Sequence, residues 1–311
     1  MAGKQWHSVS FSGTDDTFIV GTNSGAEVWS ARTGRKRYDF DVPGGVGLAS
    51  VLRNTNLSIV VGTGMAPNFP RCKASVYDHR SRMFLLDFDL GSNIRGIAYT
   101  QDRFVIALDT SIRMWDTTSL IASPPLPTCH NPHGAFAVGG ADALAYPSEA
   151  VGAVTVITRG VSRSWPAHDN TIARMTLDPS AAFLATTTAR GETICVWDVA
   201  GATEAARFHV DGHEEVDVQC MAFSPDANWL CVVYTNGEAH VFRIPDGTAT
   251  FVHLKHDVLA SCQCIFDPAG TNDGQRVGLI AVNDEKREIV RFSFDGSSGG
   301  RCDLDSCVVA Q

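Results

Sequence analysis

The residues that could bind a cation gather in a short stretch in the second half of the chain. Four carboxylates lie close together there, at Asp211, Glu214, Glu215 and Asp217. Carboxylate oxygens are ligands that Ca²⁺ prefers, but the spacing of these four fits no calcium-binding loop. We therefore interpret the stretch as a solvated acidic loop and predict no metal site in it.

A second group contains sulfur and nitrogen ligands. Cys262 and Cys264 alternate along a predicted strand, so both thiols point to one face of it. A zinc ion would need further ligands, and His253 and His256 lie nearby in the sequence. Because this spacing matches no recognised zinc motif, core packing is the favoured interpretation of the two thiols.

Two catalytic motifs that would reveal an enzyme are absent. The sequence contains no Gly-x-x-x-x-Gly-Lys-Ser/Thr and no His-Glu-x-x-His, which are the patterns of phosphate-binding loops and zinc peptidases. We predict a protein that is not an enzyme, with no catalytic residue, no metal and no cofactor.

Charge and composition limit the partners. The 311 residues include 25 Lys and Arg against 34 Asp and Glu, a formal charge of −9. This balance argues against nucleic acid as a partner, because a protein that coats phosphates needs a basic surface. The net charge does not exclude a local basic patch. The 44% of hydrophobic residues excludes a disordered chain.

The expected location in the cell follows from two observations: the sequence shows no membrane-spanning segment or signal peptide, and its cysteines are scattered. No segment reaches the roughly 18 apolar residues of a membrane-spanning helix, and the first residues lack the apolar stretch of a signal peptide. The nine cysteines are scattered, mostly within apolar runs. We interpret them as reduced core thiols and expect a cytoplasmic protein, peripheral at membranes where it meets them.

The elements that must position these residues are strands, because one short pattern recurs along the chain: an apolar strand, a turn, and a strand that ends in an aromatic residue. Its copies, one of them degenerate, are anchored at Trp29, Tyr77, Trp115, Ile157, Trp197, Phe242 and Phe292. Their spacing averages about 44 residues, the length of a four-stranded propeller blade. We predict an all-β fold, a single seven-bladed WD40-type β-propeller over residues 1–311, with blades that end near positions 29, 77, 115, 157, 197, 242 and 292.

Turn residues separate the predicted strands, as in Asp178-Pro179-Ser180, and helical periodicity is nowhere sustained. Two stretches fit the repeat less well. Residues 117–152 are predicted to form a long connector and a degenerate fourth blade, and residues 296–300 to lead to a terminal strand or a tail.

A family resemblance appears in two regions. Residues 67–78 and 88–97 are similar to the second blade of the PROPPINs and to the start of their third blade, and residues 167–169, 184–191 and 196–198 look like their fifth blade. The PROPPINs are WD-repeat propellers that bind phosphoinositides and act in autophagy. The resemblance therefore implies a scaffold at membranes.

The resemblance implies lipid contacts at a Phe-Arg-Arg-Gly motif between blades five and six. Its two arginines face two headgroup sites, because a rigid guanidinium fork donates several hydrogen bonds to phosphate. In this chain the motif falls on His209, Val210, Asp211 and Gly212, so only the glycine survives. Moving the frame by one residue places Phe208 on the aromatic position but restores no arginine pair.

Further positions of the two phosphoinositide sites are implied by the same resemblance. The first site takes His168, Thr188 and Arg190, and the second takes Gly212, His213, Thr235 and Asn236. Glu192 and Glu238 stand where the family has hydroxyls, and Cys195 where a basic residue is common. Because carboxylates repel phosphates, we predict that phosphoinositide binding is weak or lost.

Two of these histidines have a structural interpretation that we favour. In WD-repeat blades, a histidine at the place of His168 often joins a hydrogen-bond network with a hydroxyl and the blade tryptophan, here Trp197. His213 lies beside Glu214 and Glu215, which is typical of a solvated loop.

Two loops complete the comparison. The resemblance implies a long loop in blade six that enters the membrane, whereas residues 245–250 are predicted to form only a tight turn here. In blade two, Asn68, Phe69, Pro70 and Arg71 occupy a loop through which the family engages a large lipid-transfer protein. An ordinary surface loop is the alternative interpretation.

The leading hypothesis is a PROPPIN-like, non-enzymatic propeller scaffold in autophagy or membrane traffic, with protein partners and weakened phosphoinositide binding. Two alternatives stay open. One is a generic WD-repeat interaction scaffold without lipid binding, and the other is a phosphoinositide binder that uses altered sites.

Overall fold

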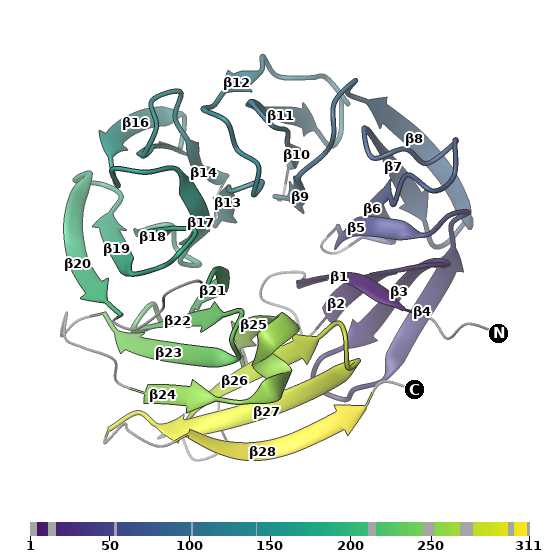
Figure 1. Cartoon of the computed structure of the whole chain (residues 1–311). Coiled ribbons are helices and arrows are strands. Elements are labelled where there is room, and N and C mark those ends of the chain that lie inside the picture. Colours follow the sequence, from purple (N-terminus) through teal and green to yellow (C-terminus); the bar gives the residue numbers. More distant parts are fainter. Residues whose placement is uncertain are drawn as a thin grey trace.

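Seven four-stranded antiparallel sheets follow one another along the chain and stand as blades around a central axis (Figure 1). The computed structural model describes residues 5–11, 17–52, 55–100, 102–140, 142–210, 216–244, 252–267, 276–297 and 302–309. The prediction of an all-β, seven-bladed propeller is confirmed. Within the described ranges, no helix is long and apolar enough to cross a membrane.

In each blade the strands follow in chain order from the axis outward (Figure 1). Blades one to four comprise β1 (Trp6–Phe11), β2 (Thr17–Thr22), β3 (Gly25–Ser30) and β4 (Lys36–Asp41); β5 (Val46–Val51), β6 (Leu57–Gly62), β7 (Lys73–Asp78) and β8 (Met83–Asp89); β9 (Gly96–Tyr99), β10 (Arg103–Ala107), β11 (Ser111–Asp116) and β12 (Leu126–Pro127); and β13 (Ala137–Gly139), β14 (Ala143–Pro147), β15 (Ala153–Thr158) and β16 (Val161–Pro166).

The remaining blades have the same order, with one short 3₁₀ helix before the last. They comprise β17 (Ile172–Leu177), β18 (Phe183–Thr188), β19 (Thr193–Asp198) and β20 (Thr203–His209); β21 (Val218–Phe223), β22 (Trp229–Tyr234), β23 (Glu238–Arg243) and β24 (Val252–Lys255); and η1 (Asp257–Ser261), β25 (Cys262–Phe266), β26 (Arg276–Asn283), β27 (Glu288–Asp295) and β28 (Cys302–Val309).

The recurring aromatic anchors mark the third strand of each blade, so the predicted blade ends near 29, 77, 115, 157, 197, 242 and 292 come one strand too early. The blades end after a fourth strand, at positions 41, 89, 127, 166, 209, 255 and 309. The reason is burial. The third strands are largely buried, whereas β8 alternates between exposed and half-buried residues and β16 is mostly exposed, so the fourth strands lack the continuous burial of the third strands.

The two stretches that fit the repeat poorly belong to blades. Within residues 117–152, Leu126 and Pro127 form an edge strand against β11, a place that suits proline because its ladder donor is not needed there. Residues 296–300 lead to the strand β28 and not to a tail. They also match the Gly-x-Ser-x-Gly pattern of serine hydrolases, but they join antiparallel strands, whereas that pattern needs a strand-to-helix turn.

In the described part of the chain the ring closes without an exchanged strand, because the first and last blades are each built from consecutive strands. Eight buried side chains form the cluster between them, namely Trp6, Phe18, Val20, Trp29, Ala31, Ile280, Val282 and Ile289. Arg291 of β27 adds a hydrogen bond from its Nη2 to the carbonyl of Ala31, at 2.6 Å.

The cysteines follow the prediction in part. Cys195, Cys220, Cys231, Cys262 and Cys264 are buried, but Cys72, Cys129 and Cys302 are half-buried and Cys307 is exposed on the outermost strand. None of the nine forms a disulfide. Of the four cysteines that are not core residues, Cys302 and Cys307 lie on the outer strand β28, and Cys72 and Cys129 lie in connecting segments.

The closing cluster should determine the stability of the whole ring. We expect Ile289→Ala to lower the free energy of unfolding by about 2–5 kcal/mol, because it opens a cavity in a fully packed contact. Urea unfolding followed by circular dichroism measures this. Leu304→Ala in the same blade is the control, since that side chain is 53% exposed; an equal loss in both variants would contradict the role of the cluster.

Candidate functional site

A pocket of about 380 Å³ opens beside blade five, where the connector from blade four meets the outer strands. Its lining comprises Pro166, Ala167, His168, Asp169, Asn170, Thr188, Glu192, Thr193, Trp197 and Arg207. Two of the three residues implied for the first phosphoinositide site, His168 and Thr188, meet here. The third, Arg190, does not line the pocket; its exposed guanidinium lies 4.0 Å from Glu192.

His168 belongs to a hydrogen-bond network that holds the blade together. Its Nε2 lies 3.0 Å from the hydroxyl of Thr186, which also accepts a hydrogen bond from Trp197 Nε1 at 2.9 Å. Thr186 is fully buried. Because the tryptophan N–H fills one lone pair of the hydroxyl, the hydroxyl proton is free to be donated to a neutral imidazole. The structure thus has the network that we favoured for His168.

Burial, together with the nearby Arg207 charge, lowers the pKa of His168 below its ordinary value. Asp169 and Glu204 act in the opposite direction but do not outweigh the burial. The imidazole is therefore neutral at neutral pH and contributes a hydrogen bond, not a positive charge, to the pocket.

The cation of the pocket is Arg207, which the sequence analysis did not identify. It lies on β20 directly opposite Cys195 of β19, the position at which a basic residue had been expected. Burial raises the pKa of Cys195 to about 11, so its thiol is uncharged. The bulge in the pairing of β19 with β20 sets this register, and register is not readable from the order of residues alone.

Arg207 is already engaged by a carboxylate. Its Nε lies 3.1 and 3.0 Å from the two carboxylate oxygens of Glu204, and its Nη2 also contacts that group. These hydrogen bonds raise the pKa of Arg207 and keep it charged. Asp169 and Glu192 add two carboxylates to the same lining. A phosphorylated headgroup would meet one neutralised arginine and an acidic rim.

The degenerate motif lies partly within the core. Val210 is buried, 5% exposed, in the cluster between blades five and six, and its N–H donates to the carbonyl of Glu192. Phe208 is buried and stacks on Phe242 at 4.4 Å. His209 is exposed, with its Nδ1 3.3 Å from the hydroxyl of Thr193. Asp211 and Gly212 lie outside the described residues.

The second implied site is described only at Thr235 and Asn236, because Gly212 and His213 also lie outside the described residues. The Thr235 hydroxyl accepts from the N–H of Asp217 at 3.2 Å. Asn236 donates from Nδ2 to Glu238 at 2.9 Å. The structure brings these residues into local turn networks.

Blades five and six meet closely beside this region. The buried Tyr234 hydroxyl donates to the carbonyl of Gly191 at 2.9 Å. Gly191 has a φ of +66°, and a Cβ there would lie 2.1 Å from Cγ2 of Val218, so glycine is required at this contact.

The blade-two loop between β6 and β7 folds back onto its own blade. Phe69 packs against Phe84 with ring centroids 5.2 Å apart, and Arg71 donates from Nε to the carbonyl of Thr63 at 2.7 Å. Asn68 and Arg71 are exposed, Pro70 is half-buried, and Met65 beside them is 83% exposed. Phe69 therefore anchors the loop, and the exposed surface consists of its neighbours.

The tight turn predicted in blade six, residues 245–250, lies outside the described residues, as do Glu214 and Glu215. The described strands on either side end at Arg243 and begin at Val252.

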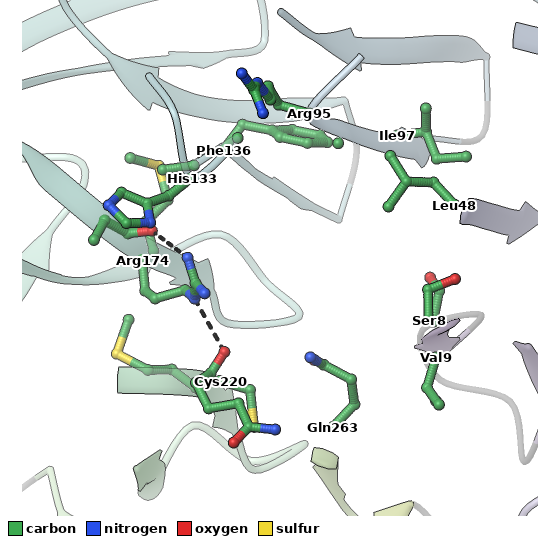
Figure 2. A pocket seen from close by; sticks show the side chains of 18 of the residues that line it. Ser8, Val9, Leu48, Arg95, Ile97, His133, Phe136, Arg174, Cys220 and Gln263 are labelled. Atoms are coloured by element: carbon green, nitrogen blue, oxygen red, sulfur yellow. Dashed lines mark hydrogen bonds between the residues drawn. The ribbon is translucent and has the colours of Figure 1, made fainter. Parts of the chain in front are cut away.

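A second cavity, of about 460 Å³, lies on the axis of the ring. Figure 2 shows side chains of the innermost strands around it, including Leu48, Ile97 and Arg174. The guanidinium of Arg174 donates to the carbonyls of Ala173 at 2.9 Å and Gln219 at 3.0 Å (Figure 2). The hydrogen bond to Gln219 of β21 thus joins blade five to blade six.

The thiols of Cys262 and Cys264 are buried, as core packing requires. Cys264 Sγ lies 3.5 Å from Cys220 Sγ and 3.9 Å from Cys231 Sγ. The histidines considered as their partners are used elsewhere: His256 caps η1 through its Nδ1, and His253 lies opposite His240.

The ring of seven sheets, with a pocket beside blade five and an axial cavity, defines the class as a seven-bladed β-propeller. The PROPPIN family model matches residues 10–254. The chain belongs to the PROPPIN family.

Two relatives are similar over much of the chain, and one of them is named for autophagy. Autophagy-related protein 18e from Arabidopsis thaliana is 27% identical, over 94% of this chain and 76% of the relative. SVP1-like protein 2 from Emericella nidulans is 28% identical, over 63% of this chain and 62% of the relative. The chain thus spans less than two thirds of the second relative.

Solved structures share the fold. Kluyveromyces lactis Hsv2 superposes with a TM-score of 0.82 at 16% identity, covering 99% of this chain and 100% of that chain. KlAtg21, in its complex with a coiled-coil of AgAtg16, gives a TM-score of 0.83 at 14% identity, with the same coverage.

The hydroxyl shared by His168 and Trp197 should stabilise blade five. We expect Thr186→Val to lower the free energy of unfolding by about 1–3 kcal/mol, because the buried indole N–H loses its acceptor. Urea denaturation measures this, with the exposed Thr203→Val of β20 as the matched control. An unchanged midpoint in the Thr186 variant would contradict the network.

Proposed function

We propose that this propeller is a non-enzymatic scaffold of autophagy or membrane traffic whose binding of phosphoinositide headgroups is weak or lost. Membership of the family supports the scaffold role. The composition of the blade-five pocket supports the loss, because its one guanidinium is paired with Glu204 and shares the lining with Asp169 and Glu192. The proposed location is the cytoplasm and the surface of membranes.

The motif position supports the same conclusion. Arginine reads a headgroup only where its guanidinium can reach the solvent-facing phosphates. Val210 is apolar and packed between two blades, so it has neither the charge nor the exposure that this contact needs. His209 is exposed but stands at the aromatic position of the motif, so its imidazole does not replace either arginine.

Liposome flotation tests the loss of binding. We expect the wild type to float no more with vesicles that contain phosphatidylinositol 3-phosphate than with phosphatidylcholine vesicles at physiological salt. Glu192→Thr should raise flotation several-fold, because it removes a carboxylate from the lining, and a charge pair of this kind is worth about 1 kcal/mol in water at contact distance.

Glu149→Thr is the control for that variant, since it makes the same charge change at an exposed turn of blade four. Strong headgroup-specific flotation of the wild type would overturn the proposal and favour a binder with altered sites, in which His168, Thr188 and Arg207 face one pocket. Because burial lowers the pKa of His168, acidification to pH 6.5 should not by itself create binding.

For protein partners we propose the blade-two loop, at Asn68, Phe69, Pro70 and Arg71, with an autophagy lipid-transfer protein as the partner. The exposed Arg71 and Asn68 beside the exposed Met65 give this loop a mixed polar and apolar surface, which is typical of interaction sites. The KlAtg21 complex with a coiled-coil is a related example of a propeller with a protein partner.

Affinity purification from cells tests the loop. We expect Arg71→Asp to reduce recovery of the lipid-transfer protein at least about tenfold, because a charge reversal in a contact costs more than about 1.4 kcal/mol. Arg80→Asp, an exposed change in the same blade, should leave recovery unchanged, and thermal melts of both variants check folding. Recovery of an unrelated complex in place of that protein would favour a generic WD-repeat scaffold.

A further inference from the structure

Three potential metal ligands come together on the outer half of blade six. Glu238 and His240 alternate along β23 and so lie on one face of it. His253 of β24 is the direct cross-strand partner of His240. One carboxylate oxygen and one nitrogen of each imidazole all lie within 4.8 Å of one another. In the described part of the chain, no other three such ligands come as close together.

Strand pairing is what creates this juxtaposition. The pairs His240 with His253 and Glu238 with Lys255 are neighbours in one antiparallel ladder, so the three ligands stand on adjacent rungs. The two imidazole rings have centroids 4.7 Å apart and planes inclined by 34°. They are therefore not stacked flat on each other, and a nitrogen of each ring can point to a common centre.

The identity of the ligands selects the ion. Two histidines and one glutamate are a recurrent zinc-binding set, in which the protein provides three ligands and leaves one position for water or another ligand. A tetrahedral zinc ion with bonds of about 2.1 Å separates its ligand atoms by about 3.4 Å. Rotation about the side-chain bonds closes the remaining distance, because His253 is exposed at the open side of the site.

The neighbouring residues hold the ligands in place. The ring of His240 lies edge-on to Tyr234 at 5.6 Å and nearly parallel to Phe242 at 6.2 Å. Asn236 Nδ2 donates to one oxygen of Glu238 at 2.9 Å, and Lys255 Nζ contacts the other at 2.9 Å. The ammonium of Lys255 is thus a cation that already occupies part of the site.

We propose that Glu238, His240 and His253 bind a divalent transition-metal ion, with Zn²⁺ as the ion that the ligand set favours. The site is separate from the blade-five pocket and from the blade-two loop. The ion replaces Lys255 as the charge partner of Glu238. It joins the third and fourth strands of blade six, where the sheet has its outer edge.

Titration of the chelator-treated full chain with Zn²⁺ and Co²⁺ tests the proposal. We expect about one ion per chain, with the visible absorption of four-coordinate Co²⁺. His253→Ala and Glu238→Gln should each weaken Zn²⁺ binding at least tenfold, since each removes one of the three protein ligands. His209→Ala, an exposed histidine on the outer strand of blade five, should leave the affinity unchanged.

Lys255→Met supplies a test with the opposite sign. Removal of the competing ammonium should strengthen Zn²⁺ binding several-fold, whereas a merely structural role of the cluster predicts no gain. Melting curves recorded without metal check that each variant is folded. Equal Zn²⁺ affinity of wild type and His253→Ala, or a thiolate-to-Co²⁺ charge-transfer band that places the ion on the cysteines, would overturn the proposal.

Discussion

The structure depends on one constraint: every sheet of the ring must bury both of its faces against its neighbours. This explains why the third strands are largely buried, and why apolar clusters lie between blades and not within a single central core. Among the described residues, the first and last blades meet this constraint without an exchanged strand, through side-chain packing and a hydrogen bond from Arg291. The contact between Trp6, Trp29 and Ile289 is therefore as necessary as any of the hydrogen-bonded ladders.

Charged and polar side chains line the axial cavity and gather at the connectors and on the outer half of the blades, where water is available. The blade-five pocket lies there, and its polar groups also hold the blade together. Thr186 accepts from Trp197 and contacts His168, so the histidine is a buried, neutral member of the fold. Family membership and the proposed loss of headgroup affinity are compatible, because the apolar residues that pack blade five are not the charged residues that line its pocket.

The distribution of charge separates this chain from the lipid-binding pattern that the family resemblance implied. Arg207 provides a guanidinium close to the position where one was expected, but Glu204 neutralises it. In blade six, Glu238 is paired with Lys255 and lies next to two imidazoles. Carboxylates repel phosphates but attract cations. The carboxylates therefore support both proposals, the weak binding of phosphoinositide headgroups and the binding of a divalent metal ion.

The sequence by itself determined the fold class and the number of blades, because strand burial depends on the local alternation of apolar residues and on turn residues, and both recur in each blade. It also pointed to the network of His168 with Trp197. Tertiary structure decided the rest: the exposed fourth strands, the packing of Phe69 under its loop, the place of Arg207 opposite Cys195 and the pairing of His253 with His240. These depend on strand register and bulges, which are set by the pairing and packing of whole strands and cannot be read from the order of residues alone.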